Sequence, residues 1–345
     1  MASLELPAPD RSGNIITTVG ESLVDRIRSQ ESGPALSDHV GGSPLNVAVG
    51  CARLGVQTRL VTHFGNDDHG HLIAQHLKDN GVEVLTGGTA PTSTATATVD
   101  PDGSATYEFS LDWDLANGTL AASAAIETSS HLHTGSIATM LMPGARTVHT
   151  LLRDAREKAT ISYDPNCRPT IIQDVGFARR QAERFIGISD VVKASDEDLQ
   201  WLYPDVSADM AMQHLLELGP ALVILTRGAL GPVALTRQSR IELPAYTIVV
   251  ADTVGAGDSF MAALIAALDQ LDLLGSSKRD DLMRLDRERL LPILRYATKA
   301  SGITCSRVGA NPPRLDEIGT ATCPASVPQL QIRRAENHNA AHASS

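Results

Sequence analysis

The chain alternates two kinds of segment: short runs of β-branched and apolar residues, and longer stretches with apolar residues every three or four positions. The short runs predict strands and the longer stretches predict helices, with Gly55 and Gly81 as two of the stop signals. The predicted strands are residues 15–19, 57–63, 160–163, 190–193, 221–226, 233–236 and 241–243. The predicted helices are residues 43–54, 69–80, 176–187, 196–203, 209–218, 258–270 and 290–306. This alternation predicts an α/β fold with a mostly parallel sheet covered by helices on both faces.

One segment breaks the alternation. Residues 92–99 and 104–111 predict two strands, and the sequence DPDG at 100–103 predicts the turn between them. Small or polar residues alternate with apolar ones along both strands, so one face of the hairpin can stay wet. The hairpin is either an ordinary edge of the sheet or a lid that projects over a site.

Composition narrows the class of protein and its partners. The chain has 345 residues, of which 42% are hydrophobic but only 3% aromatic, so Ala, Val, Leu and Ile must build the core. The length suits one large α/β domain or two small ones. The formal net charge of −11 argues against nucleic acid or an anionic membrane as the main partner. A small anionic ligand remains compatible with this charge, because a local site can override it.

The ends of the chain and its cysteines point to a cytoplasmic protein. Residues 1–13 and 321–345 are expected to be flexible tails around a domain at 14–320. The amino-terminal residues do not resemble a signal peptide, and the longest apolar run, 260–268, is far shorter than the roughly 20 residues of a membrane helix. The four cysteines show no C-x-x-C spacing, which disfavours a disulfide framework or a zinc site.

The sequence DTVGAGDSF, at residues 252–260, carries the strongest chemical signal. Gly255 and Gly257 allow a sharp turn into the helix that follows, and the N–H groups there would form an anion site without a lysine. A carboxylate at Asp258 would repel an anion, unless it faces a neutral hydroxyl and removes its proton. That hydroxyl could then attack a phosphorus atom.

A simpler interpretation of the same stretch is structural. An aspartate in the first turn often only stabilises the helix dipole, and glycine pairs are common in turns. Other phosphate-binding motifs do not fit. The chain has no G-x-x-x-x-G-K-[ST], no G-x-G-x-x-G after the first strand, and neither HRD nor DFG.

Together with GGSPLNVAVGCARLG at 41–55, this stretch resembles the ribokinase-like family of carbohydrate kinases. Further matching segments follow in the expected order: GESLVD at 20–25, FGNDDHG at 64–70, DPNCRP at 164–169, KASDED at 193–198, TRGALG at 226–231 and GA at 309–310. DPNCRP with GESLVD looks most like the fructokinase branch. The resemblance implies a three-layer α/β/α domain at 14–320, with lid strands at about 30–40 and 90–115 inserted.

The resemblance also implies roles for single residues. Asp258 would be the base, and Gly255, Ala256 and Gly257 would form the anion hole. The residues expected to bind the sugar are Asp25, Gly41, Gly42, Asn46, Arg168 and Asp258. The glycines leave room for a sugar ring, and Asn46 offers a donor and an acceptor to hydroxyls. Simpler interpretations are a helix-entry turn for the glycines and a surface ion pair for Arg168.

The implied nucleotide and metal sites use other segments. The residues expected to bind ATP are Lys193, Ser195, Thr226, Gly228, Gly231 and Gly257. The family orders Mg²⁺-bound water with an Asn-x-x-Glu pattern, where this chain has Ser195 and Asp198, so the shorter Asp198 puts that contact in doubt. Family members often hold K⁺ beside the anion hole, and the positions that correspond are Asp252, Val254, Thr304, Arg307 and Gly309.

The expected activity is ATP-dependent phosphorylation of a primary hydroxyl of a small sugar, with fructose as the first choice. The alternatives are 2-keto-3-deoxygluconate, ribose, tagatose or a nucleoside as substrate, or a non-catalytic sugar-binding relative. A nicotinamide-dependent oxidoreductase is strongly disfavoured. Sugar and ATP are the expected partners. Members of the family often pair through their lids, so the resemblance also implies a homodimer through the lids as one arrangement to test.

Histidines and a tryptophan offer weaker signals. The spacing of His63, His69, His71 and His76 fits no common zinc pattern. His131 and His133 point the same way on an expected strand, where packing and ligand contact are both open. Trp113, just after the hairpin, could stack on the sugar or adenine, or plug the space between lid and body.

Overall fold

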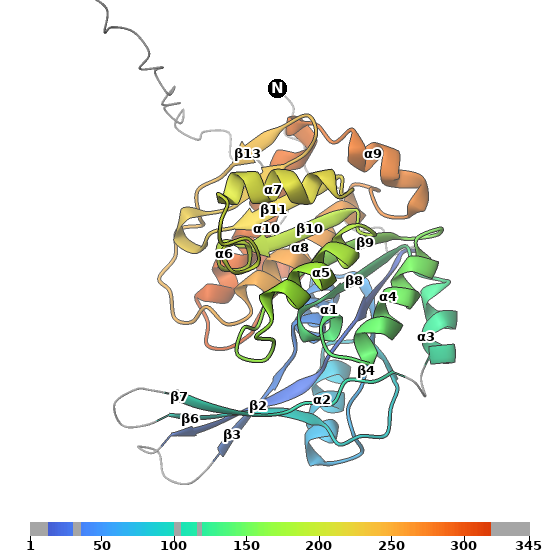
Figure 1. Ribbon diagram of the computed structural model, residues 1–345, viewed down its shortest axis with the longest axis vertical. Helices are drawn as coiled ribbons and strands as arrows, with labels where there is room; N and C mark the ends of the chain where they lie inside the picture. Colours follow the sequence, from blue (N-terminus) through green and yellow to red (C-terminus); the bar gives the residue numbers. More distant parts are fainter. Residues whose placement is uncertain (1–12, 30–35, 100–104, 116–118, 319–345) are drawn as a thin grey trace, which may run out of the picture.

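The computed structural model describes residues 13–29, 36–99, 105–115 and 119–318. Within this part, nine strands form a main sheet in the order β13-β12-β11-β10-β9-β8-β1-β4-β5 (Figure 1). Their bounds are Ile15–Val19 (β1), Gln57–Thr62 (β4), Glu83–Thr86 (β5), His131–Gly135 (β8), Thr160–Asp164 (β9), Val191–Ser195 (β10), Leu222–Thr226 (β11), Val233–Leu235 (β12) and Arg240–Glu242 (β13). Only the pairs β11–β12 and β12–β13 are antiparallel, so the predicted mostly parallel sheet is confirmed.

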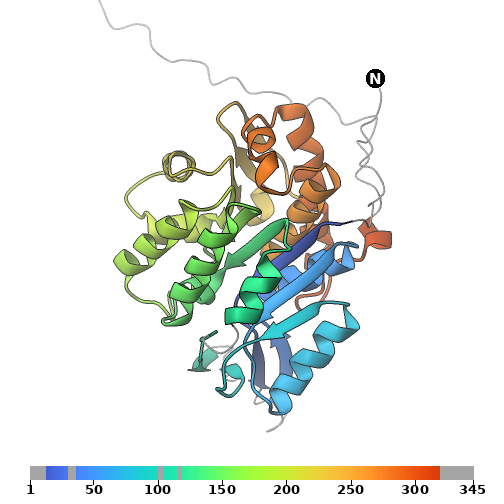
Figure 2. The same cartoon turned by 90° about the vertical axis from the view of Figure 1, so that its right-hand side faces the viewer.

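Helices cover both faces of this sheet, as Figure 2 shows. One face packs against α1 (Ser43–Arg53), α8 (Ala256–Gln270) and α10 (Arg287–Cys305). The other face packs against α3 (Thr119–Ile126), α4 (Gly144–Ala155), α5 (Val175–Ile186), α6 (Asp196–Leu202) and α7 (Ala208–Glu217). The remaining helices are α2 (Asp68–Asp79), α9 (Arg279–Met283) and α11 (Leu315–Ile318), with 3-10 turns Ser136–Thr139 (η2), Gly228–Leu230 (η3) and Ser276–Lys278 (η4).

The two-residue period of a strand explains why the sheet builds two cores. Along β10, Val191 belongs to the core under α8, whereas its neighbour Val192 belongs to the core under α5. Both residues are fully buried. Strands covered on both faces read as nearly continuous apolar runs, which is the pattern in the sequence.

A second sheet forms the lid. It contains β2 (Leu23–Ser29), β3 (Leu36–Gly41), β6 (Ser93–Val99) and β7 (Ala105–Ser110), in the order β3-β2-β6-β7. Figure 1 shows these strands projecting away from the main sheet. The predicted hairpin is therefore confirmed, and the interpretation as an edge of the main sheet is wrong; the predicted turn at 100–103 lies outside the described residues.

Several boundaries differ from the sequence prediction. Lid strands were expected at about 30–40, but β2 lies earlier and carries Asp25, so this residue belongs to the lid. The helices predicted from 258 and 290 begin at Ala256 and Arg287. The pattern missed β2, β5, α3, α4, α9 and α11. Residues 1–12 and 321–345 of the expected tails lie outside the described part of the chain.

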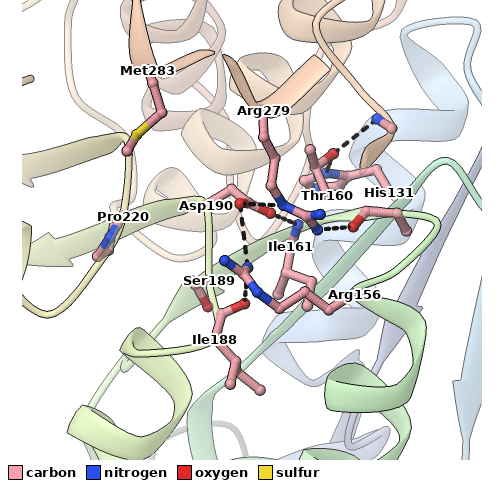
Figure 3. Close-up of polar contacts among 12 residues, drawn as sticks. His131, Arg156, Thr160, Ile161, Ile188, Ser189, Asp190, Pro220, Arg279 and Met283 are labelled. Carbon is pink, nitrogen blue, oxygen red and sulfur yellow. Dashed lines mark hydrogen bonds and ion pairs between the residues drawn. The ribbon is translucent and has the colours of Figure 1, made fainter. Parts of the chain in front are cut away.

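The amino ends of β9 and β10 are tied to the surrounding helices by one buried carboxylate (Figure 3). Asp190 accepts the backbone N–H of Ile161 at 2.8 Å and lies 2.8 Å from Nε of Arg279 and 3.3 Å from Nη1 of Arg156. Arg156 follows α4 and Arg279 begins α9. One side chain thus joins two strands to two helices, at the edge of the sheet opposite the carboxyl ends of the strands.

We expect Asp190→Asn to destabilise the fold by about 2 kcal/mol, because two partly buried guanidinium groups lose a buried charged partner. Urea unfolding of the variant, followed by circular dichroism, measures the change. Asp154→Asn is the matched control, since the Arg153–Asp154 pair is 60% and 63% exposed and should change stability by less than about 0.5 kcal/mol. Equal stabilities for the two variants would show that the cluster does not hold the sheet to its helices.

Candidate active site

The predicted catalytic loop leads into α8 at the carboxyl edge of the main sheet. Gly255 has a left-handed backbone (φ 73°), and a Cβ there would lie 2.7 Å from the Cβ of Ala310, so glycine is required on two counts. The N–H of Ala256 donates to the carbonyl of Thr253 at 3.2 Å and closes the turn. Gly257 and Asp258 follow in the first turn, where backbone N–H groups lack intrahelical partners.

Asp258 is held by two side chains from α1. Its Oδ1 accepts from Ser43 Oγ at 2.6 Å, and its Oδ2 accepts from Asn46 Nδ2 at 2.8 Å. The residue is 8% exposed. Since each carboxylate oxygen can accept two hydrogen bonds, both oxygens keep one acceptor site for a ligand. The structure thus brings together Asn46 and Asp258, two of the residues expected to bind the sugar, with the Asn46 amide directed at the carboxylate.

Close packing of α1 on α8 makes these two hydrogen bonds reachable. A Cβ on Gly50 would lie 2.5 Å from the Cβ of Ala262, a distance that side-chain atoms do not tolerate. Cys51 Sγ also lies 3.6 Å from the carbonyl of Ala262. Small residues at this crossing let the two backbones approach. The sequence analysis overlooked Ser43, although it stands directly before Pro44 in GGSPLN, at the start of a helix.

A buried ion pair lies on the other side of the helix entry. Lys193 Nζ is 2.8 Å from Asp164 Oδ2, and their side chains are 4% and 2% exposed. Burial raises the pKa of Asp164 to about 6, and Lys193 opposes this. Burial lowers the pKa of Lys193, but the carboxylates of Asp164, Asp198 and Asp258 outweigh it, so the pKa is raised. Both partners are therefore charged at neutral pH.

The ammonium of Lys193 reaches the predicted anion hole. A Cβ on Gly257 would lie 3.2 Å from Nζ of Lys193. The sequence analysis expected an anion site without a lysine in its loop, and the structure adds one from the neighbouring strand β10. Asp164, which fixes this lysine, is a further residue that the sequence analysis did not select, although it opens the DPNCRP segment.

The predicted sugar residues from the lid and from the start of α1 lie together. A Cβ on Gly41 would lie 2.4 Å from Asp25 Oδ2, and one on Gly42 would lie 2.4 Å from the carbonyl oxygen of Glu21. Gly42 also has φ 116°. Burial raises the pKa of Asp25, whereas the charges of His39 and Arg168 lower it. Gly42 thus has no room for a side chain against the backbone of Glu21, whereas a side chain at position 41 would displace the carboxylate of Asp25.

Arg168 is exposed and turned toward its own loop. Its Nη1 donates to Asn166 Oδ1 at 2.7 Å and to the carbonyl of Cys167 at 3.0 Å. Its charge nevertheless lowers the pKa values of Asp25 and Glu21. A contact of Arg168 with sugar or phosphate stays a prediction, and it requires the guanidinium to leave these carbonyl groups.

The predicted nucleotide residues share the adjoining strand ends. Ser195 and Thr226 pair in the register of β10 and β11. Gly228 and Gly231 have φ 48° and 77°, and a Cβ on Gly231 would lie 2.2 Å from the carbonyl of Leu243. These two positions of the turn therefore favour glycine, and the second has no room for a side chain.

Asp198 caps its helix as well as facing the ion pair. Its Oδ2 accepts from the N–H and Oγ of Ser195, both at 2.8 Å, and its Oδ1 accepts from the N–H of Cys167 at 2.6 Å. The carboxylate raises the pKa of Lys193, so it lies in the same charged group. These contacts fix Asp198 and leave one acceptor site, on Oδ1.

The five positions matched to a potassium site are partly assembled by hydrogen bonds. Asp252 accepts from the N–H of Gly309 at 2.8 Å and of Val254 at 3.1 Å, and these donors lower its pKa. Thr304 is buried and donates to Ser259 Oγ at 2.7 Å, while Arg307 pairs with Glu317. No cluster of three or more His, Cys, Asp or Glu side chains is placed to hold a metal within the described ranges.

The weaker sequence signals have packing roles. Trp113 is buried, and its Nε1 donates to the carbonyl of Ala138 at 2.9 Å, which agrees with a plug between lid and body. His131 and His133 are fully buried and both contact Ser162 Oγ, at 2.8 and 2.9 Å. Burial lowers the pKa of His131 to about 3. In the clustered segment, His63 contacts the carbonyl of Ala90 at 2.9 Å.

Known proteins with related sequences and structures are sugar kinases. The pfkB family of carbohydrate kinases matches residues 15–317. A fructokinase from Rhizobium leguminosarum bv. trifolii is 33% identical over 267 residues, or 75% of this chain and 81% of that protein. The structure of a fructokinase from Xylella fastidiosa with bound ATP superposes with a TM-score of 0.78 at 26% identity, covering 88% of this chain and 96% of that chain.

A second solved structure, of a fructokinase from Vibrio cholerae O395 in a form with fructose, ADP and calcium ion, has a TM-score of 0.70 at 25% identity. It covers 86% of this chain and 94% of that chain. The layered sheet, the β lid and these matches define a ribokinase-like sugar kinase. The chain belongs to the pfkB family of carbohydrate kinases. Among the described residues, no helix combines the length and the apolar character needed to cross a membrane.

We expect Ser43→Ala to lower kcat about tenfold, because Asp258 loses one of the two donors that orient it. KM for the sugar should change by less than about threefold, since Ser43 is not among the sugar-binding candidates. Steady-state kinetics at saturating ATP separates the two constants. An unchanged kcat would show that Asn46 alone suffices to orient Asp258.

Proposed function

We propose that this carbohydrate kinase transfers the γ-phosphoryl group of ATP to a primary hydroxyl of fructose. The main support is the position of Asp258. Its carboxylate is fixed by Ser43 and Asn46 in the first turn of α8, next to Gly257 and the ammonium of Lys193. A proton acceptor and an anion site one residue apart suit an alcohol that attacks a phosphoryl group.

Asp258 acts as the general base in this proposal. It accepts the proton of the sugar hydroxyl as that oxygen bonds to the γ-phosphorus, while the bond from phosphorus to the β,γ-bridging oxygen breaks and ADP leaves. The proton then passes from Asp258 to solvent. Ser43 and Asn46 hold the carboxylate so that little reorientation is needed at the moment of transfer.

The transferred group is stabilised by positive charge and backbone dipoles. Gly255 and Gly257 supply N–H groups at the start of α8, and Lys193 supplies a charge that Asp164 holds in place. Ala256 joins this set if its N–H turns from Thr253 toward the phosphate. Mg²⁺ would be ordered through water by Asp198, and when bound it neutralises charge on the β- and γ-phosphates.

The remaining candidate residues are assigned to the sugar, the nucleotide and K⁺. Asp25, Gly41, Gly42 and Arg168 form the sugar side, and closure of the lid keeps out water, which would otherwise accept the phosphoryl group. Thr226, Gly228 and Gly231, with Ser195, form the nucleotide side. K⁺ is assigned to the positions around the anion hole that correspond in the family: Asp252, Val254, Thr304, Arg307 and Gly309.

Fructose is preferred because the related proteins above carry the name fructokinase, and one of them was solved with fructose and ADP. The other candidates are 2-keto-3-deoxygluconate, ribose, tagatose and nucleosides, all of which carry hydroxyl groups that this chemistry could use. A non-catalytic sugar-binding protein is the remaining alternative. The intact GAGD segment at 255–258 argues against it.

A substrate panel with coupled detection of ADP under Mg-ATP tests the proposal. We expect fructose to give the highest kcat/KM, and Asp258→Asn to lower kcat by about 10³-fold or more while sugar affinity changes by only a few fold.

Each contrary outcome identifies a different error. A higher kcat/KM for another sugar would correct the substrate, and sugar binding without ADP release would favour the non-catalytic alternative. Near-normal turnover by Asp258→Asn would contradict the assignment of the base. Exposed Asp154→Asn is the matched control for the Asp-to-Asn change.

A further inference from the structure

Glu21 occupies the place where the chain leaves the body of the kinase for the lid. It lies between β1, which ends at Val19, and β2, which begins at Leu23. The residue is only 4% exposed, although it lies near the predicted sugar site. None of the roles assigned above uses this buried carboxyl group.

The contacts of Glu21 connect both ends of the lid to the body. Its Oε2 accepts the N–H of Ala138 at 3.1 Å, and the Ser136 hydroxyl is a second donor. Its main-chain carbonyl faces Gly42, where the chain returns from the lid and enters α1. Ser136 itself adopts φ 55°, an uncommon conformation for a residue other than glycine. One residue therefore lies beside both the outgoing and the returning chain of the lid, and its carboxylate is hydrogen-bonded to the turn η2 after β8.

The charge of Glu21 is set by burial and by the sugar site. Burial raises its pKa from 4.5 to about 7, and hydrogen bonds from its own backbone, Ser136 and Ala138 oppose this, as does the charge of Arg168. Arg168 lowers the pKa of Asp25 as well, together with His39 on the lid. Glu21 therefore changes its charge near neutral pH, within the electrostatic field of the sugar residues.

The ionised form suits the observed contacts better than the protonated form. All three groups that surround the carboxyl are donors: the backbone N–H of Glu21, the Ser136 hydroxyl and the N–H of Ala138. A carboxylate accepts from all of them, whereas a carboxylic acid must direct its own O–H somewhere among them.

We propose that Glu21 is a positioning residue whose ionised carboxylate fixes the hinge of the lid for sugar binding. The proposal rests on the function proposed above, in which Asp25 and Arg168 hold the sugar. In it, the sugar binds tightly to the ionised form and weakly to the protonated form.

This role predicts an unusual combination of effects, because the ionised carboxylate lowers the stability of the fold while it improves sugar binding. A carboxyl with its pKa raised from 4.5 to about 7 contributes stability below pH 4.5 and loses it as the pH rises through about 7. Ionised Glu21 therefore weakens the fold while it improves sugar binding. A residue that only supports the structure would lower affinity and stability together when replaced.

The test compares wild type with Glu21→Gln across pH 6 to 8. Between pH 6 and pH 8 the ionised fraction of a group with a pKa near 7 rises from about 0.1 to about 0.9. Because only the ionised form binds fructose tightly in this proposal, KM of the wild type for fructose should fall about tenfold over this range. Glu21→Gln should show a KM that is several-fold higher at pH 8 and lacks this dependence, with kcat within about twofold. Its urea midpoint at pH 8 should equal or exceed that of the wild type. Exposed Glu157→Gln should behave as wild type.

A second measurement needs no variant. Calorimetric titration of the wild type with fructose, without ATP and in two buffers of different ionisation enthalpy, should show release of about half a proton at pH 7. No proton release, or a Glu21→Gln variant that keeps the tenfold pH dependence, overturns the role of Glu21 alone. A wild type that neither binds nor phosphorylates fructose overturns the proposed function and this inference with it.

Discussion

The close crossing of α1 and α8 is the constraint on which the active site depends. Gly50 faces Ala262 with no room for a larger residue, and this brings Ser43 and Asn46 within hydrogen-bond distance of Asp258. Asp258, the proposed base, is therefore positioned by helix packing as well as by its own loop. Packing of this kind is costly to distort, because protein interiors are as dense as organic crystals.

Charge is distributed unevenly between the two edges of the main sheet. At the amino ends, Asp190 joins helices to strands and serves the fold. At the carboxyl ends, Lys193, Asp164 and Glu21 are buried, where ionised groups cost folding free energy. Such groups fit a site that must meet a phosphoryl group and a sugar, since a low-dielectric setting strengthens their interactions with a ligand. Burial of these ionised groups therefore lowers the stability of the fold at the place where they serve function.

Much of the fold could be predicted from the sequence, because parallel strands buried on both faces leave strong apolar runs, as in β10 and β11. Gly255 could be predicted as well, because a sharp turn into a helix is a local feature that favours glycine. The α3 segment could not, since its alanine-rich sequence has little periodicity. Contacts such as Ser43 with Asp258 join residues 215 positions apart, and no local pattern encodes them. Lys193 beside Gly257 and Glu21 beside Ala138 depend on the same long-range geometry.

A crystal structure of the complex with fructose and a non-hydrolysable ATP analogue tests the central claim most directly. The account predicts a primary hydroxyl of the sugar within about 3 Å of an Asp258 carboxylate oxygen. It also predicts the γ-phosphate against the N–H of Gly257 and the ammonium of Lys193. A sugar whose hydroxyl groups all lie beyond reach of Asp258, with the carboxylate enclosed between Ser43 and Asn46, would contradict the account.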